Sequence, residues 1–163
     1  IFSKPKKNLS KKHAISGIDK YLRRAVHRQM VSDVPLGAFL SGGLDSSAIV
    51  SFAQEKNPNI RCFSIETIGT RDSGFVDDLP YAIKAAKHLD VPLDIVTVDS
   101  NQMAADLEYM VAQLDEPLAD PAALNVLYIS KLAREQGIKV LLSGAGGDDL
   151  FTGYRRHYAV LVW

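Results

Sequence analysis

The sequence predicts an α/β protein of three layers, α-β-α, in which helices cover both faces of a parallel sheet. Short apolar segments of strand length alternate along the chain with longer segments of helical periodicity. The apolar segments contain few polar residues, as expected of strands that are buried on both faces of a parallel sheet. Two glycine-rich loops, at 41–47 and 143–149, directly follow two of these segments. Ligands of such sheets bind beyond the carboxyl ends of the strands, so both loops are predicted to lie at the binding edge.

Length and composition indicate one globular domain. The chain has 163 residues, of which 47% are hydrophobic and 23% are charged, so it can bury a core. Lys and Arg total 19, as do Asp and Glu, and this balance indicates no nucleic-acid partner. The longest apolar runs have strand length, which predicts no membrane span. Cys62 is the single cysteine and cannot form an internal disulfide, so we expect a reducing, cytoplasmic location.

The elements follow from periodicity and from turn residues. In the first expected helix, Ile15, Leu22 and Val26 share one face, and Pro35 follows its end. Gly137 ends the last expected helix. Residues 68–78 are predicted to form a polar loop and 115–121 a stiff acidic one with two prolines. The expected helices are 15–31, 46–56, 79–89, 102–114 and 122–136, and the expected strands are 36–40, 60–66, 93–98 and 139–142.

The first glycine-rich loop is a predicted anion site. It joins an apolar strand to a helix, and the free N–H groups and the dipole of a helix N-terminus attract anions. Gly42 and Gly43 let the backbone approach an anion closely. Asp45 would repel a phosphate unless a cation lay between them, which indicates Mg²⁺. The alternative is a Gly/Ser turn that only caps the helix.

The second loop, SGAGGDD, has the same order of residue types as the first. If the first and fourth strands are neighbours at a switch point, both loops face one cleft. Asp45 and Asp148 would then flank a bound triphosphate, where two carboxylates make sense as Mg²⁺ ligands together with phosphate oxygens and water. For Asp148 and Asp149 alone, the alternative is a pair of acids that cap a helix.

These motifs resemble a known family. Ser-Gly-Gly-x-Asp-Ser at 41–46 is similar to the PP-loop of ATP pyrophosphatases, which cleave ATP between its α and β phosphates. Together with SGAGGDDLFTGY at 143–154, it resembles the synthetase domain of the asparagine synthase family, and DVPLG at 33–37 and DEPLADP at 115–121 also fit. The resemblance covers nearly the whole chain. It implies a PP-loop (HUP) fold of the adenine nucleotide alpha hydrolase type. It also implies adenylation of a carboxylate, classically aspartate, from which ammonia then displaces AMP.

The resemblance also implies roles for individual residues. Asp45 and Asp148 would be the catalytic and metal-binding acids, while Asp115, Asp120 and Asn125 would lie toward the acceptor carboxylate. The implied ligands are ATP, Mg²⁺ and a small carboxylate such as aspartate, with ammonia from a glutaminase domain of the full-length protein. A homodimer is left open. The implied pyrophosphate contacts are Ser41, Gly42, Gly43, Asp45, Ser46 and Ser47, and the implied adenosine contacts are Leu40, Ile65, Ser143 and Gly144.

The chain departs from the family pattern in ways that affect the expected reaction. Ala145 stands where asparagine-forming members commonly have Glu, so the acceptor could instead be a β-lactam precursor or a sugar acid. We expect residues 1–13 to be a tail or linker and 14–163 to be the ATP-pyrophosphatase domain. This domain is expected to be truncated, because family members carry further helices and a catalytic lysine after the second loop. The N-terminal glutaminase domain is also expected to be absent. Ala145 and the expected truncation keep a non-catalytic ATP-binding module as a further alternative.

Overall fold

Four parallel strands form one sheet in the order β3-β2-β1-β4. The computed structural model describes residues 9–69, 78–116, 118, 120, 122–154, 157 and 159. The strands are β1 (Leu36–Phe39), β2 (Cys62–Ile68), β3 (Leu93–Asp99) and β4 (Val140–Leu142). Because β1 pairs with β2 on one side and with β4 on the other, the switch point lies between β1 and β4. The expected adjacency of the first and fourth strands is therefore confirmed.

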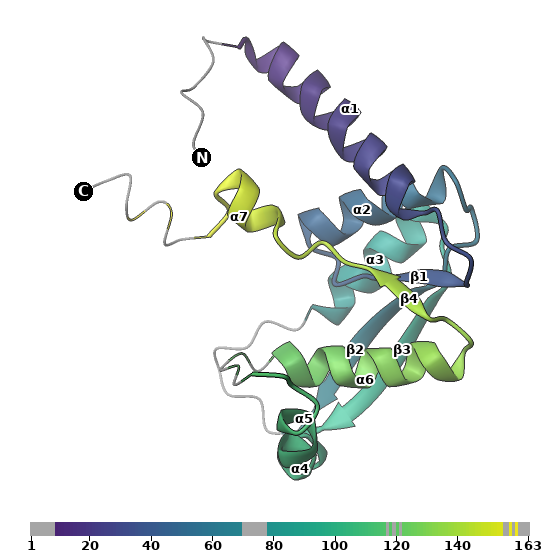
Figure 1. Cartoon of the computed structure of the whole chain (residues 1–163), viewed down its shortest axis with the longest axis vertical. Coiled ribbons are helices and arrows are strands. Elements are labelled where there is room, and N and C mark those ends of the chain that lie inside the picture. Colours follow the sequence, from purple (N-terminus) through teal and green to yellow (C-terminus); the bar gives the residue numbers. More distant parts are fainter. Residues whose placement is uncertain are drawn as a thin grey trace.

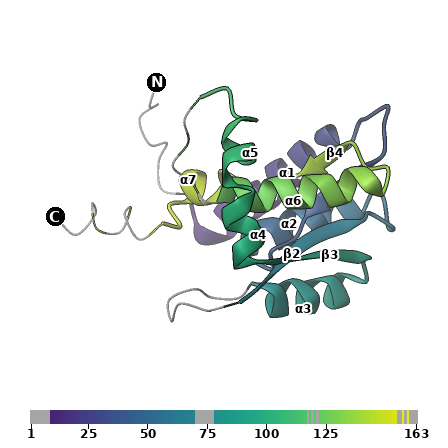
Figure 2. The ribbon, with the colours of Figure 1, turned by 90° about the horizontal axis from the view of Figure 1, so that it is seen from below.

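Helices cover both faces of this sheet, as predicted (Figures 1 and 2). On one face, α2 (Leu44–Gln54) and α3 (Leu79–Leu89) pack against β1 and β2. On the other face, α6 (Ala122–Glu135) crosses β2 and β3. Figure 2 shows α3 and α6 on opposite sides of β2 and β3. The remaining helices are α1 (Lys11–Gln29), α4 (Ser100–Ala105), α5 (Leu107–Val111) and α7 (Gly147–Phe151).

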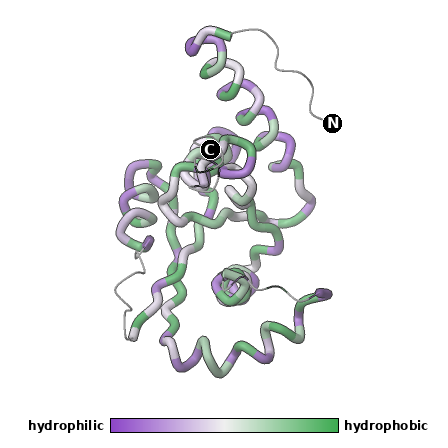
Figure 3. Tube along the Cα trace, turned by 90° about the vertical axis from the view of Figure 1, so that its left-hand side faces the viewer, coloured by the Kyte–Doolittle hydropathy of each residue, from purple (hydrophilic) through white to green (hydrophobic). Residues whose placement is uncertain are grey.

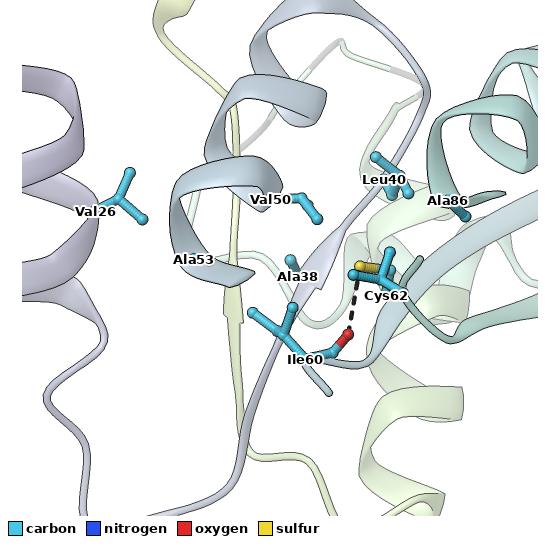
Figure 4. Packing of buried hydrophobic residues seen from close by; sticks show 9 residues of the cluster. Val26, Ala38, Leu40, Val50, Ala53, Ile60, Cys62 and Ala86 are labelled. Atoms are coloured by element: carbon cyan, nitrogen blue, oxygen red, sulfur yellow. Dashed lines mark hydrogen bonds between the residues drawn. The ribbon is translucent and has the colours of Figure 1, made fainter. Parts of the chain in front are cut away.

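The central core lies between the sheet and the layer formed by α2 and α3 (Figure 4). Leu40, Val50 and Ile60 are at most 1% exposed and belong to one cluster with Ala86 of α3. Cys62 also belongs to it, and its thiol donates to the carbonyl oxygen of Ile60 at 3.8 Å. These apolar contacts fix the end of β1, from which the first glycine-rich loop departs.

The first helix begins earlier than predicted and extends beyond the sheet. It starts at Lys11 rather than at residue 15, because the Ser10 side chain accepts a hydrogen bond from the backbone nitrogen of His13 and caps it. Only Val26 of α1 is buried. The protruding part carries hydrophobic and hydrophilic residues in alternation (Figure 3). Most of the expected lysine-rich tail and of the polar loop at 68–78 lies outside the described residues.

The single helix expected at 102–114 is wrong, because two short helices occupy this region. Asp99 caps α4 by accepting from the backbone nitrogens of Asn101 and Gln102, each at 2.8 Å. Asp106 separates α4 from α5, and its carboxylate accepts from Gln102 Nε2 at 2.8 Å and from the Tyr128 hydroxyl at 2.7 Å. These hydrogen bonds join α4 to α6 at the position where the helix is interrupted.

Among the residues that the structure describes, no helix has both the length and the apolar character that a membrane span requires.

Candidate functional site

The two glycine-rich loops lie side by side at the carboxyl edge of the sheet. Ala38 near the end of β1 pairs in register with Leu142 at the end of β4, so both loops leave the sheet at the same level. The second loop turns directly into α7, and Asp148 and Asp149 lie in the first turn of this short helix. The strand order thus brings together two motifs that are separated by about a hundred residues in the sequence.

Glycines hold the two loops in direct contact. A Cβ atom at Gly144 would lie 2.8 Å from the backbone nitrogen of Ser46, and one at Gly147 would lie 2.1 Å from Asp45 Oδ2. On its other side, the first loop packs against α3. There Gly42 has φ of 79°, and a Cβ atom on it would lie 2.2 Å from the carbonyl carbon of Tyr81. The first loop is therefore fixed between α3 and the second loop.

The N-terminus of α2 faces the site without a side-chain cap. The N-cap residue is Gly43, which provides no capping side chain, and Asp45 is the acidic residue of the first turn. The buried Ser46 hydroxyl donates to the carbonyl oxygen of Gly43 at 3.2 Å and lies 3.0 Å from the Ser41 hydroxyl oxygen. This arrangement orders the loop and leaves the positive end of the α2 dipole available to an anion.

One cavity of about 340 Å³ opens between the two loops. Its volume lies within the range of small-molecule sites. Asp45 and Asp148 both line it, so the structure brings the two predicted acids to one cavity. The other lining residues are Phe39, Ser41, Gly43, Leu44, Ser46, Ser143, Gly144 and Ala145.

Some predicted site residues do not line this cavity. The Leu40 side chain is 1% exposed and belongs to the core. Ile65 is half-buried and packs against the clusters beneath α6. Gly42 contacts α3 as described above, and Ser47, in the first turn of α2, is half-buried.

Phe39 also lines the cavity, although the loop motifs in the sequence do not indicate it. Successive residues of a strand face opposite sides of the sheet. Leu40 therefore joins Ala38 in the core beneath α2 and α3, whereas Phe39 packs against the α6 cluster and reaches the cavity. The signal was available in this alternation, because Phe39 is the last residue of β1 before the loop.

The residues expected toward the acceptor also lie outside the cavity lining. Asp115 and Asp120 are exposed, and Asp120 Oδ1 accepts from the backbone nitrogen of Ala122 at 2.9 Å, which caps α6. Asn125 lies in the first turns of α6, and its Oδ1 is buried without a hydrogen-bond partner among the residues that the structure describes. Ala145, by contrast, is exposed and lines the cavity.

The donor set of the cavity fits Mg²⁺ bound together with a phosphate. Within the described part of the chain, no three His, Cys, Asp or Glu side chains are grouped to hold a metal ion. Asp45 and Asp148 are the acids that line the cavity. Mg²⁺ is usually held by one or two carboxylates with substrate phosphates and water, so this pair suffices only if a phosphate completes the shell.

Cys62 has no role in this site. Burial, together with the nearby charge of Asp94, raises the pKa of the Cys62 thiol to about 12. The thiol therefore stays protonated at neutral pH, and the thiolate is the nucleophilic form.

Comparison with known proteins identifies a family and several relatives. The family model for asparagine synthase matches residues 17–163. Asparagine synthetase [glutamine-hydrolyzing] 1 of Bacillus subtilis is 39% identical over 130 residues, which are 80% of this chain and 20% of that protein. Amidase chyE of Penicillium rubens is 31% identical over 167 residues, covering 94% of this chain and 24% of that protein. This chain therefore spans between a fifth and a quarter of the length of these relatives.

Two solved structures share the fold at low sequence identity. The U34-tRNA thiolase NcsA from Methanococcus maripaludis aligns with a TM-score of 0.55 and 17% identity, covering 94% of this chain and 56% of that one. The NH3-dependent NAD synthetase from Campylobacter jejuni aligns with a TM-score of 0.50 and 13% identity, covering 85% of this chain and 60% of that one. These alignments confirm the predicted PP-loop type of fold. Because the family model covers nearly all the described elements and both glycine-rich loops, this chain belongs to the asparagine synthase family.

Proposed function

We propose that residues 14–163 form the ATP-pyrophosphatase domain of an enzyme that adenylates a carboxylate and then converts it to an amide. The model reaction is that of asparagine synthetase (glutamine-hydrolysing). The observation that carries the proposal is that Asp45 and Asp148, from two distant loops, line one cavity beside the uncapped N-terminus of α2. A site for an uncharged ligand has little need of two carboxylates beside an anion-binding helix end.

The polar residues of the first loop are the proposed phosphate contacts. The dipole of α2 and the N–H groups of its first turn would bind the triphosphate, with the exposed Ser41 hydroxyl as a further donor. Phe39 offers an apolar surface in the same cavity for the adenosine part. Asp45 and Asp148 would hold Mg²⁺, which when bound neutralises charge on the pyrophosphate leaving group.

The proposed chemistry requires alignment rather than a protein nucleophile. The acceptor carboxylate attacks the α-phosphorus, pyrophosphate leaves, and ammonia then attacks the acyl carbon and displaces AMP. The two rigidly packed loops hold the phosphates in place for in-line attack, which lowers the entropic part of the barrier. Fixed N–H groups at the end of α2 stabilise the charge that develops on the phosphates.

The identity of the acceptor depends on the residue at position 145. Ala145 lines the cavity, and its methyl group provides neither charge nor a hydrogen bond. Asparagine-forming members of the family commonly have Glu there, so a carboxylate other than aspartate, such as a β-lactam precursor or a sugar acid, is the second candidate. Aspartate remains the first acceptor to test because the relatives include asparagine synthetases.

ATP–pyrophosphate exchange tests the proposal directly. The assay is run on the longest polypeptide that carries this sequence, with Mg²⁺, ATP and labelled pyrophosphate, and with or without aspartate. Label in ATP that depends on aspartate would establish adenylation of aspartate and show that Ala145 permits it.

Two other results would revise the proposal. Exchange that requires a different carboxylate would retain adenylation and reject aspartate as the acceptor. Absence of exchange with any amino acid or sugar acid, in a protein that still binds Mg-ATP, would favour the non-catalytic nucleotide-binding module.

A further inference from the structure

The Asp45 carboxylate lies directly against the backbone of Gly147. A Cβ atom at Gly147 would lie 2.1 Å from Asp45 Oδ2, 2.3 Å from Cγ and 2.8 Å from Oδ1. All three atoms of the carboxyl group are therefore closer than any ordinary contact with carbon permits. A side chain at position 147 and the observed orientation of Asp45 exclude each other.

The contact at Gly147 differs from the other close contact between the loops. At Gly144 a Cβ atom would meet the backbone nitrogen of Ser46 at 2.8 Å, so a side chain there would force the two main chains apart. At Gly147 the atoms that would have to move belong to the end of a flexible side chain. A methyl group at 147 is thus expected to turn the carboxylate away while leaving the paths of both loops intact.

The second acid of the cavity is packed in the same manner. A Cβ atom at Gly153 would lie 1.9 Å from Asp148 Oδ1, and the backbone nitrogen of Gly153 donates to the carbonyl oxygen of Asp148 at 2.9 Å. Both acids that line the cavity therefore place a carboxylate against a glycine that leaves no room for a methyl group.

We propose that Gly147 is a positioning residue for Asp45, which acts by holding the carboxylate in the orientation that faces the nucleotide-bound cation. Gly147 directly precedes Asp148 in the chain. The same contact therefore sets Asp45 relative to the backbone that carries the second acid. This inference rests on the proposed function, because it assigns a purpose to the contact only if both acids serve a metal–phosphate site.

The test measures nucleotide binding rather than turnover. ATP affinity is determined by titration calorimetry, once with Mg²⁺ and once with EDTA, for the unmodified chain and for Gly147→Ala. The variant should bind Mg-ATP about 10- to 100-fold more weakly, the range typical of residues that orient metal ligands. Its affinity for ATP in EDTA should be unchanged, because the phosphate contacts of α2 remain. A loss that is equal in both buffers would indicate general damage and would overturn the positioning role.

A double-mutant cycle shows whether Gly147 acts through Asp45. In the Asp45→Asn background, Gly147→Ala should cause no further loss of Mg-ATP affinity, since the oriented ligand is already gone. Losses that multiply in the double variant would contradict the inference. Gly17→Ala in α1 is the matched control, because a Cβ atom there meets nothing within 4 Å, and its ATP affinity should equal that of the unmodified chain.

A melting experiment covers the case in which Gly147→Ala does not fold. The double variant Gly147→Ala/Asp45→Gly removes the carboxyl group that the new methyl group would meet, so the thermal transition should return. Failure to recover it would show that Gly147 does not act through Asp45.

The results separate this inference from the proposed function. An unmodified chain whose ATP binding does not depend on Mg²⁺ would overturn both. Magnesium-dependent binding that Gly147→Ala leaves unchanged would overturn the positioning role alone.

Discussion

At the scale of single residues, Asp45 combines two opposing influences. It lies in the first turn of α2, where the helix dipole stabilises a negative charge, and it lines the cavity that we assign to the triphosphate. Without a cation, its charge would repel the bound phosphates. Asp45 is therefore expected to favour ATP binding only when Mg²⁺ is present, and ATP affinity with and without Mg²⁺ measures this dependence.

Asp45→Asn should abolish the gain in ATP affinity that Mg²⁺ provides and should leave the fold intact. The neutral amide is a weaker ligand for Mg²⁺, and its lack of charge also removes repulsion, so ATP binding in EDTA should be equal or tighter. Titration calorimetry in both buffers checks this, with Asp33→Asn as a control at an exposed site before β1. An unchanged affinity for Mg-ATP in Asp45→Asn would remove Asp45 from the metal site.

At the scale of elements, the polar network around Asp106 joins α4 and α5 to α6. Hydrogen bonds from Gln102 and from the Tyr128 hydroxyl lower the pKa of Asp106 below its usual value of 3.8. Burial, followed by the hydrogen bond and the charge of Asp106, raises the pKa of Tyr128 from 10.0 to about 12. Protonation of Asp106 or ionisation of Tyr128 would therefore weaken the connection between these helices.

Tyr128→Phe should lower the free energy of unfolding within a defined pH window. The contribution of Asp106 is present above its unfolded pKa near 3.8 and is lost as pH falls through its lower folded pKa. The contribution of Tyr128 is present below pH 10 and is lost as pH rises from 10.0 to about 12. The difference in free energy of unfolding between the unmodified chain and Tyr128→Phe should thus be constant from about pH 5 to 9. It should become smaller below and above this range.

Urea unfolding across this range measures the effect of Tyr128→Phe. Tyr109→Phe is the matched control, because it keeps the ring beneath Lys131 Nζ and does not involve the Asp106 network. If the loss of unfolding free energy caused by Tyr128→Phe stayed constant from pH 3 to 12, protonation of Asp106 and ionisation of Tyr128 would have no effect on stability through this network.

At the scale of the whole molecule, one core connects the sheet to the helices that position the site. Leu40 belongs to this core with α2 and α3, and the first loop begins at the next residue. Leu44 is four positions away and is 85% exposed. Substitutions of these two leucines therefore distinguish the contribution of the core to stability from the contribution of the loop surface.

Leu40→Ala should destabilise the chain by about 2–5 kcal/mol, because it leaves a cavity at a site that is only 1% exposed. Leu44→Ala should change stability by less than about 0.5 kcal/mol, as is usual for exposed positions. Urea unfolding monitored by circular dichroism compares the two variants. Equal effects of both substitutions would contradict the placement of Leu40 in the core.

Much of the fold and part of the site were predictable from local patterns. The alternation of apolar and amphipathic segments identified the parallel sheet, and the two glycine-rich loops after strands identified its binding edge. The sequence pattern did not predict the break between α4 and α5 at Asp106, whose carboxylate accepts a hydrogen bond from Tyr128 of α6. The family resemblance indicated Leu40, whose side chain lies in the core, and the alternation along β1 places the neighbouring Phe39 in the cavity lining.

The sequence by itself determined the family, the class of fold and the candidates Asp45 and Asp148, because these depend on residue types at short spacing. Only the tertiary structure decided that Phe39 faces the cavity and that Gly147 lies against the Asp45 carboxylate. The physical reason is strand order. The pairing of β4 with β1 brings residues about a hundred positions apart into contact, and no local pattern encodes how two such loops pack against each other.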